Sequence, residues 1–210
     1  MGLYLKKIID NNSILGLWEM EEEVKALLQR IKLSARDTIT FNAFRNDKRR
    51  REWLSTRILL NELLKSNIYI SYDEYGKPWL ENSPYNISIS HTNGIVGVML
   101  TTKKQLGLDI ERMSSKIGKI ALKFLNSREF QMLSVENRIF HLYIHWCAKE
   151  ALFKIYGKNS LSFTKNLTIN PFDIQKNGQI TGNIITNFTH EEYKLNYFTL
   201  DDYIIVWGFK

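Results

Sequence analysis

The sequence predicts an α+β protein made of two similar halves, each with helices packed on an antiparallel sheet. Two stretches, 46–66 and 136–156, carry apolar residues at helical spacing. After each stretch the apolar residues alternate with polar ones and turn residues recur, which is typical of antiparallel strands. Helices followed by strands, twice in one chain, indicate a duplicated module. We place the boundary between 1–105 and 106–210.

The composition is that of a folded globular protein. The 210 residues are 44% hydrophobic and 24% charged, with 29 Lys+Arg against 22 Asp+Glu for a net charge of +7. The single cysteine, Cys147, excludes a disulfide scaffold. We expect no membrane span, because no apolar run reaches about 18 residues. The first residues do not resemble a secretory signal, so we expect a reducing, cytoplasmic location.

In the first half, helical patterns cover 19–32 and 46–66, the second beginning at Asn46 or Asp47. Basic residues concentrated at 45–51 oppose the helix dipole, which favours an anionic partner nearby. A solvated helix face is the simpler alternative. The expected strands and turns that follow are 68–72, a turn at 75–78, 86–90, a turn at 91–94, and 95–100.

In the second half, a strand is expected at 106–111. Residues 116–133 have a helical pattern broken near 126–127, and the helix at 136–156 should end at Gly157. The expected strands and turns that follow are 166–175, a turn at 177–178, 179–186, 193–200, a turn at 201–202, and 203–209.

Two carboxylates share one face of the strand at 106–111. Alternation places Asp109 and Glu111 together, with Cα atoms about 6–7 Å apart, so that both can bind one hard cation. Gly107 lies on the same face, where its missing side chain allows a close approach to the backbone. An edge strand that turns its polar face to water is the alternative.

A third carboxylate, Glu150, falls on the apolar stripe of the helix at 136–156, between Trp146 and Phe153. A carboxylate in a core-facing position must be paired or bound to a metal. Lys154 lies four residues further on, so a buried ion pair is one explanation. If Glu150 instead meets Asp109 and Glu111, the three suit Mg²⁺. Zinc is disfavoured, because there is no His/Cys cluster.

His91 follows Ser90 at the end of an expected strand. A histidine in such a turn is commonly structural or solvated. Beside a basic helix and Lys77 it can instead donate to a phosphate.

Taken together and in this order, these segments resemble the 4′-phosphopantetheinyl transferases of the surfactin-synthetase-activating type. The matching segments are Tyr75-Gly76-Lys77-Pro78, Ile89-Ser90-His91-Thr92, Gly107-Leu108-Asp109-Ile110-Glu111, and Trp146-Cys147-Ala148-Lys149-Glu150-Ala151 with Lys154. The basic helix at 49–57 also resembles the family's. Cys147 departs from the Ser or Thr that is usual there. The length is similar to that of members with two fused halves, which implies a monomer.

The resemblance implies transfer of the 4′-phosphopantetheine arm of coenzyme A to a serine of an apo acyl or peptidyl carrier protein, releasing 3′,5′-ADP. It implies that Asp109, Glu111 and Glu150 bind Mg²⁺ and that Lys154 stabilises charge on the transferred phosphoryl group. Glu150, Glu129 or a metal-bound water is the candidate base. Because carriers are generally acidic, a basic surface would speed their encounter.

By the same resemblance, Arg51, Lys77, Ser90 and His91 hold the nucleotide end of coenzyme A, with Arg49 and Arg50 as alternatives to Arg51. Residues 1–105 are then the nucleotide side, and 106–210 the metal-binding and catalytic side. Two other functions are weighed: a Mg²⁺-dependent nucleotide phosphohydrolase, and a basic nucleic-acid-binding module. Nucleic acid is disfavoured, because the basic cluster lies on a helix and the aromatic residues of the expected strands face the core instead of interleaving with basic residues.

Overall fold

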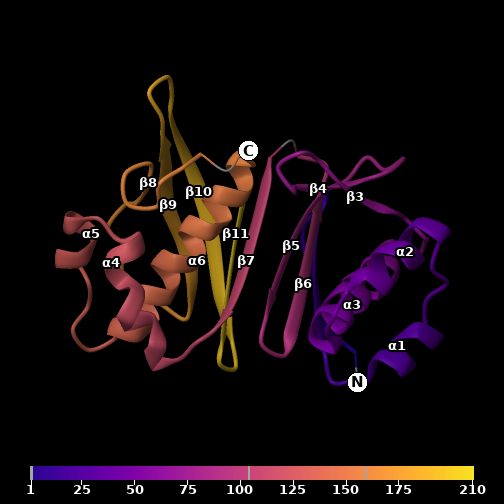
Figure 1. Ribbon diagram of the computed structural model, residues 1–210. Helices are drawn as coiled ribbons and strands as arrows, with labels where there is room; N and C mark the ends of the chain where they lie inside the picture. Colours follow the sequence, from indigo (N-terminus) through magenta and orange to yellow (C-terminus); the bar gives the residue numbers. More distant parts are fainter. Residues whose placement is uncertain (1, 104, 159) are drawn as a thin grey trace. The chain divides into compact units, whose positions relative to one another are not determined.

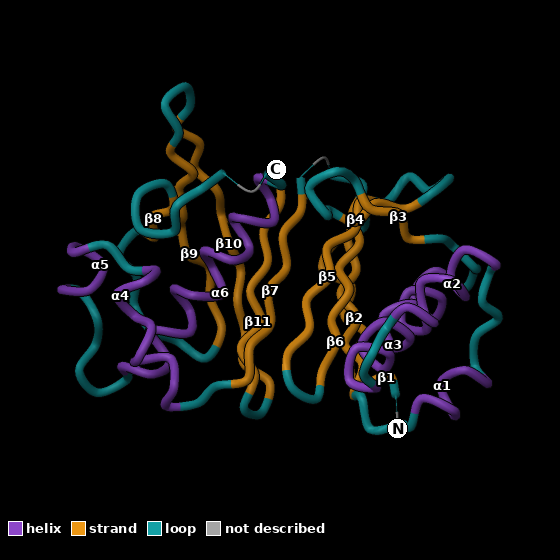
Figure 2. The backbone as a smooth tube through the Cα atoms, viewed as in Figure 1, coloured by secondary structure: helices purple, strands orange, loops and turns teal. Residues whose placement is uncertain are grey.

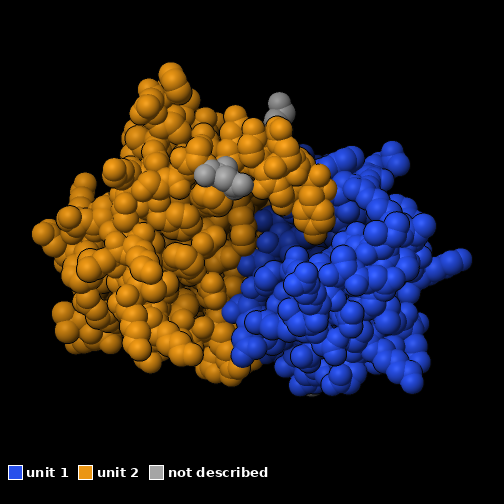
Figure 3. Space-filling view, in the orientation of Figure 1, with its two compact units in different colours: residues 1–71, 78–102 blue, residues 72–77, 103–210 orange. Residues whose placement is uncertain are grey.

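The computed structural model describes residues 2–103, 105–158 and 160–210. The chain divides into two compact units, residues 1–71 with 78–102 and residues 72–77 with 103–210 (Figure 3). Both contain helices and an antiparallel sheet (Figures 1 and 2), so the predicted α+β class is confirmed. The short segment 72–77 belongs to the second unit although it lies in the first half of the sequence. The predicted functional division at residue 105 stays a prediction.

The first unit contains a sheet with strand order β1-β2-β6-β5 and a small β3-β4 pair. Its elements are β1 (Leu3–Asp10), β2 (Ser13–Glu19), α1 (Val24–Gln29), α2 (Ala35–Ala43), α3 (Asp47–Leu64), β3 (Ile70–Tyr72), β4 (Pro78–Leu80), β5 (Asn86–Thr92) and β6 (Ile95–Thr101). Neighbouring strands of the larger sheet are antiparallel throughout.

The long helix α3 packs on β2 and β6 of this sheet. It begins where the side chain of Asn46 accepts a hydrogen bond from the backbone of Arg49, as an N-cap should. Its Ile58 and all its leucines except the partly buried Leu64 are buried with Trp18, Val98 and other residues in one apolar core. The predicted start of this helix is therefore confirmed.

The second unit contains a sheet with strand order β7-β11-β10-β9-β8. Its elements are β7 (Leu106–Arg112), the 3-10 helix η1 (Ser115–Ile120), α4 (Ala121–Phe124), α5 (Ser127–Gln131), α6 (Arg138–Tyr156), β8 (Leu167–Ile169), β9 (Asn177–Ile185), β10 (His190–Leu200) and β11 (Tyr203–Phe209). In this unit α6 crosses the sheet over β7 and β11 (Figure 1).

Helix α6 ends as expected at Gly157, which has a φ of 73°. Ala148, Ala151 and Leu152 are completely buried on the side that faces the sheet core. A Cβ atom at Gly107 of β7 would collide with the backbone carbonyl oxygen of Ala151. The absence of a side chain at Gly107 therefore lets the helix lie directly on the strand.

Both units repeat one pairing scheme. In the first, β2 precedes the helices and pairs with the last strand, β6, which pairs with β5. In the second, β7 precedes the helices and pairs with the last strand, β11, which pairs with β10. This repetition agrees with the predicted duplication, but a strand comes before the helices in each unit.

Several element predictions differ from the structure. The helix expected at 19–32 is only α1, because β2 continues to Glu19, and neither β1, β2 nor α2 was predicted. The strand expected at 166–175 is reduced to β8, since Pro171 has no N–H for a ladder. Asn177-Gly178 begins β9 rather than forming a turn, and His91 lies within β5. Within the described residues, no helix is long and apolar enough to cross a membrane.

Candidate functional site

The polar face of β7 is covered by α6. Asp109 is only 5% exposed, and Glu111 is half-buried. The group that approaches Gly107 is the helix itself, since the Ala151 carbonyl lies over it. An edge strand with its polar face in water is therefore excluded, and the two carboxylates point toward α6.

Lys154 of α6 is bound to β7. Its Nζ atom donates to Asp109 Oδ1 at 2.8 Å and to the Leu108 carbonyl at 2.7 Å. The pair is largely buried, with 7% of the Asp109 side chain exposed. The sequence suggested Glu150 as the ion-pair partner of Lys154, but the direct contact is with Asp109, on another element.

Glu150 lies in the same electrostatic environment. Its pKa is raised to about 7, first by burial and then by the charge of Asp109, while Lys154 acts in the opposite direction and Glu111 adds a further increase. Three carboxylates and one ammonium group therefore interact where α6 crosses β7. Nearby, burial and the charge of Asp109 raise the pKa of the Cys147 thiol, which is inside the core.

Trp146 contributes a contact that the sequence did not reveal. Its indole Nε1 donates to Glu111 Oε1 at 3.0 Å. From the sequence this residue was interpreted only as a core anchor. Its place four residues before Glu150, on the same stripe of the helix, was the available signal, because the N–H of a buried indole usually finds an acceptor.

The chemistry of this group fits Mg²⁺. Mg²⁺ prefers carboxylate oxygens, and a cation would favour the charged form of Glu150, whose pKa is raised first by burial and then by the charge of Asp109. Among the described residues, however, no three His, Cys, Asp or Glu side chains are arranged closely enough to hold a metal ion together. Asp109 Oδ1 is bound by Lys154 instead.

Glu129, one of the candidate bases, is used structurally. It is 3% exposed, and its Oε2 atom accepts from Lys149 Nζ at 2.6 Å and from the Asn126 backbone at 2.9 Å. Its Oε1 atom accepts from the Ile169 backbone at 2.8 Å. A carboxylate so enclosed is badly placed to take a proton from a protein substrate.

The first unit holds a separate basic cluster. Arg49 Nη1 lies 3.2 Å from both His91 Nε2 and Glu52 Oε2. His91 is 42% exposed, whereas Glu52 and Ser90 are buried. Of the three neighbouring arginines, Arg49 contacts His91. Glu52 was not predicted, although a glutamate on the buried face of α3 was a signal.

Lys77 lies at the C-terminal end of α6, within the second unit. Its Nζ atom donates to the Ile155 carbonyl at 3.3 Å, and burial lowers its pKa. A side chain at Gly157 would meet Lys77 Nζ at 2.9 Å. Lys77 thus interacts with the helix that carries Glu150 and Lys154, a contact absent from any local pattern.

The comparison with known families covers the second half of the chain. Residues 105–207 match the model of the 4′-phosphopantetheinyl transferase superfamily. This part of the chain is similar to that superfamily. The matched segment includes the carboxylates of β7 and α6, Trp146 and Lys154, whereas Arg49 and His91 lie outside it.

Curated transferases are similar to part of this chain. The 4′-phosphopantetheinyl transferase gsp of Aneurinibacillus migulanus is 31% identical over 136 residues, covering 58% of this chain and 54% of the relative. Sfp of Bacillus subtilis is 31% identical over 104 residues, 46% of this chain and 45% of the relative. AcpT of Salmonella typhi is 25% identical over 115 residues, covering 52% of this chain and 60% of the relative. The chain spans about half the length of the curated relatives it matches.

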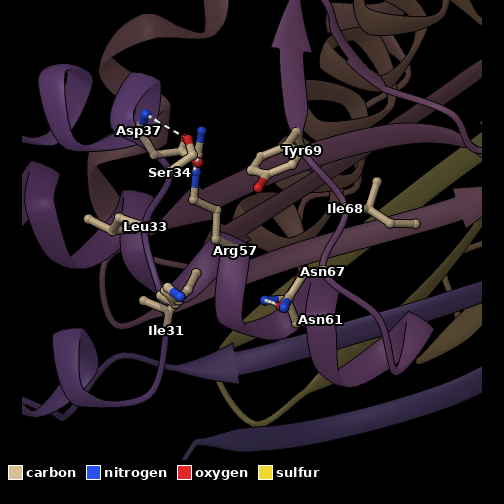
Figure 4. A pocket seen from close by; sticks show the side chains of 10 residues that line it. Ile31, Leu33, Ser34, Asp37, Arg57, Asn61, Asn67, Ile68 and Tyr69 are labelled. Carbon is tan, nitrogen blue, oxygen red and sulfur yellow. Dashed lines mark hydrogen bonds and ion pairs between the residues drawn. The ribbon is translucent and has the colours of Figure 1, made fainter.

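A cavity of about 260 Å³ lies elsewhere, in the first unit (Figure 4). Arg57 at its wall is ion-paired through Nε to Asp37 Oδ1 at 3.2 Å, and Ser34 donates to Asp37 Oδ2. Lys32, Asn61, Asn67 and Tyr69 complete the polar lining. None of the predicted coenzyme A-binding residues lines this cavity.

Proposed function

We propose that this chain transfers the 4′-phosphopantetheine arm of coenzyme A to a serine hydroxyl of an apo acyl or peptidyl carrier protein and releases 3′,5′-ADP. The observation that supports this most is the electrostatic coupling of Asp109, Glu111 and Glu150 beside Lys154 at the crossing of β7 and α6. The named activity of the partly covered relatives points the same way.

Asp109, Glu111 and Glu150 are the proposed Mg²⁺ ligands. When bound, the ion would supply positive charge against the pyrophosphate of coenzyme A. Lys154, already at the strand, would hold a further positive charge near the transferred phosphoryl group. Trp146 orients Glu111 through its indole N–H.

Glu150 is the proposed base for the serine hydroxyl, with a water beside it as the alternative. Glu150 lies in the charged group with Asp109, Glu111 and Lys154, and a positioned carboxylate can take a proton from a substrate hydroxyl. Glu129 is not proposed for this task, because its oxygens already accept backbone and lysine hydrogens.

Arg49 and His91 are the proposed contacts for a phosphate at the nucleotide end of coenzyme A. Arg51, two residues after Arg49, and Ser90, directly before His91, are proposed to contribute to the same binding. Lys77 would contribute by holding the end of α6 or by contacting coenzyme A itself. The net charge of +7 would speed the approach of an acidic carrier. A monomeric state and a cytoplasmic location stay predictions.

The test is direct transfer. The chain is incubated with coenzyme A, Mg²⁺ and apo carriers from fatty-acid, polyketide and peptide synthesis, and each carrier is weighed by mass spectrometry. Addition of one phosphopantetheine supports the proposal. Phosphate release from coenzyme A without any carrier modification would instead identify a phosphohydrolase.

Variants connect the result to the site. Asp109→Asn and Glu150→Gln should each reduce transfer about 100-fold or more while the circular dichroism spectrum is kept. Asp202→Asn is the matched control, because this carboxylate is 73% exposed at the turn before β11 and pairs only loosely with Arg112 at 3.6 Å. Near-normal transfer by both site variants would refute the metal assignment.

A further inference from the structure

A fully buried lysine lies next to Glu150 in the sequence. Lys149 is 0% exposed, and its Nζ atom donates to the Phe124 carbonyl at 2.7 Å, to Glu129 Oε2 at 2.6 Å and to the Phe163 carbonyl at 2.9 Å. These bonds use all three hydrogens of an ammonium group. Lys149 therefore ties α6 to the end of α4, to α5 and to the segment before β8.

Glu129 makes this connection specific. Burial lowers the pKa of Lys149, and the charge of Glu129 acts in the opposite direction. Glu129 also forms the capping box of α5 with Asn126 and accepts from the backbone of Ile169 in β8. The pair thus connects α6 to the backbone at the start of α5 and to the backbone of β8.

The two residues whose carbonyls Lys149 holds also pack on Trp146. The Phe124 ring meets the indole edge-on with centroids 5.2 Å apart, and the Phe163 ring stacks on it at 5.6 Å. Both phenylalanine backbones are held by the same ammonium group. The orientation of the indole between them therefore depends on Lys149.

The indole in turn holds a proposed metal ligand, since Trp146 Nε1 donates to Glu111 Oε1. We propose that the Lys149–Glu129 pair is a positioning device for Glu111, acting through the rings of Phe124 and Phe163 and the N–H of Trp146. This inference rests on the proposed function, because it assigns Glu111 to the metal. Lys149 and Glu129 are positioning residues that do not touch the substrate.

The physical reason is the mobility of a glutamate side chain. Glu111 is half-buried at the end of β7, and its carboxylate can adopt several rotamers unless a donor fixes one. Groups that orient a metal ligand typically change metal affinity 10- to 100-fold when they are removed. The ring cluster supplies such an orientation only while its backbone supports stay in place.

The experiment measures divalent-ion binding directly. Mn²⁺ is titrated into the chain saturated with coenzyme A, and free Mn²⁺ is followed by electron paramagnetic resonance. Trp146→Phe, which keeps a ring but removes the N–H, should weaken Mn²⁺ binding about 10-fold. Trp207→Phe is the matched control, because this buried indole N–H has no hydrogen-bond partner among the described residues. It should bind Mn²⁺ like the wild type.

Lys149→Met should show the same weakening, and the double variant with Trp146→Phe should bind no more weakly than either single variant, because both act along one path. Independent losses that multiply to about 100-fold would refute the path. If Lys149→Met does not fold, Glu129→Gln replaces it and should weaken binding in the same direction by about threefold.

Carrier modification by the wild type separates this inference from the proposed function. If the wild type transfers phosphopantetheine while Lys149→Met or Glu129→Gln binds Mn²⁺ normally, the positioning device is refuted and the function stands. If the wild type neither modifies any carrier nor binds Mn²⁺, both are refuted.

Discussion

Replacing Gly107 with alanine tests how closely α6 approaches β7. The added Cβ atom would collide with the Ala151 carbonyl oxygen and approach Ile155 Cγ1 at 2.9 Å. The first of these is helix backbone in the C-terminal half of α6, so no side-chain rotation can relieve the contact. The helix must move away from the strand, or the strand must bend.

The cost follows from the kind of atom that is hit. Overpacking a core costs about 1–3 kcal/mol, and a backbone collision belongs at the upper end, near 3 kcal/mol. With a urea m-value of about 2 kcal/mol/M, the midpoint of unfolding should fall by about 1.5 M. Because Asp109 lies on β7 and Glu150 on α6, a displacement of about 1 Å should also reduce transfer about 100-fold.

Urea unfolding followed by circular dichroism measures the first effect, and carrier modification measures the second. Gly182→Ala is the matched control, since its Cβ would meet only side-chain ends, Leu152 Cδ1 at 2.8 Å and Ile169 Cδ1 at 3.0 Å. It should cost about 1 kcal/mol. Equal midpoints for Gly107→Ala, Gly182→Ala and the wild type would refute the close packing of α6 on β7.

Three further predictions concern single side chains. Lys154→Met should lower kcat for transfer about 100-fold with a smaller effect on KM, because its charge acts on the developing phosphoryl charge; a change in KM alone would contradict this. Arg49→Gln should raise KM for coenzyme A about 10-fold, with Arg50→Gln as control, since Arg50 pairs with exposed Asp47; equal effects would argue against the Arg49–His91 contact. Burial lowers the pKa of His145 to about 3. Below pH 6.5 the unfolded chain therefore binds a proton that the folded chain does not bind, and the free energy of unfolding decreases as the pH is lowered. From pH 7 to 5 this contributes about 2 kcal/mol, which His145→Gln should remove in urea titrations at both values. An unchanged pH dependence would show that His145 is not buried in its neutral form.

Local periodicity was enough for the long elements. The helices α3 and α6 were expected close to their observed bounds, because their apolar spacing, the Asn46 cap and Gly157 are local signals. The first strands were missed for a different reason. β2 lies inside its sheet, and its residues 15–18 are all buried, so it lacks the alternation that marks a half-buried strand.

For the candidate site, the sequence likewise predicted the local arrangement of the residues but not their contact partners. The alternation along β7 placed Asp109 and Glu111 on one face, and the helical spacing of α6 identified Glu150 as an unusual carboxylate. Which groups they meet was not readable. Lys154 pairs with Asp109 rather than Glu150, and the indole of Trp146 reaches Glu111, 35 residues away along the chain.

The sequence by itself therefore determined the α+β class, the faces of individual strands and helices, and the residue types available for phosphate and metal chemistry. Only the tertiary structure decided the partners: Lys149 with Glu129, Arg49 with His91, and Lys77 with the end of α6. Periodicity describes how side chains are arranged around one element. Ion pairs and close approaches depend on which elements pack together, and that is set by the whole core of each unit.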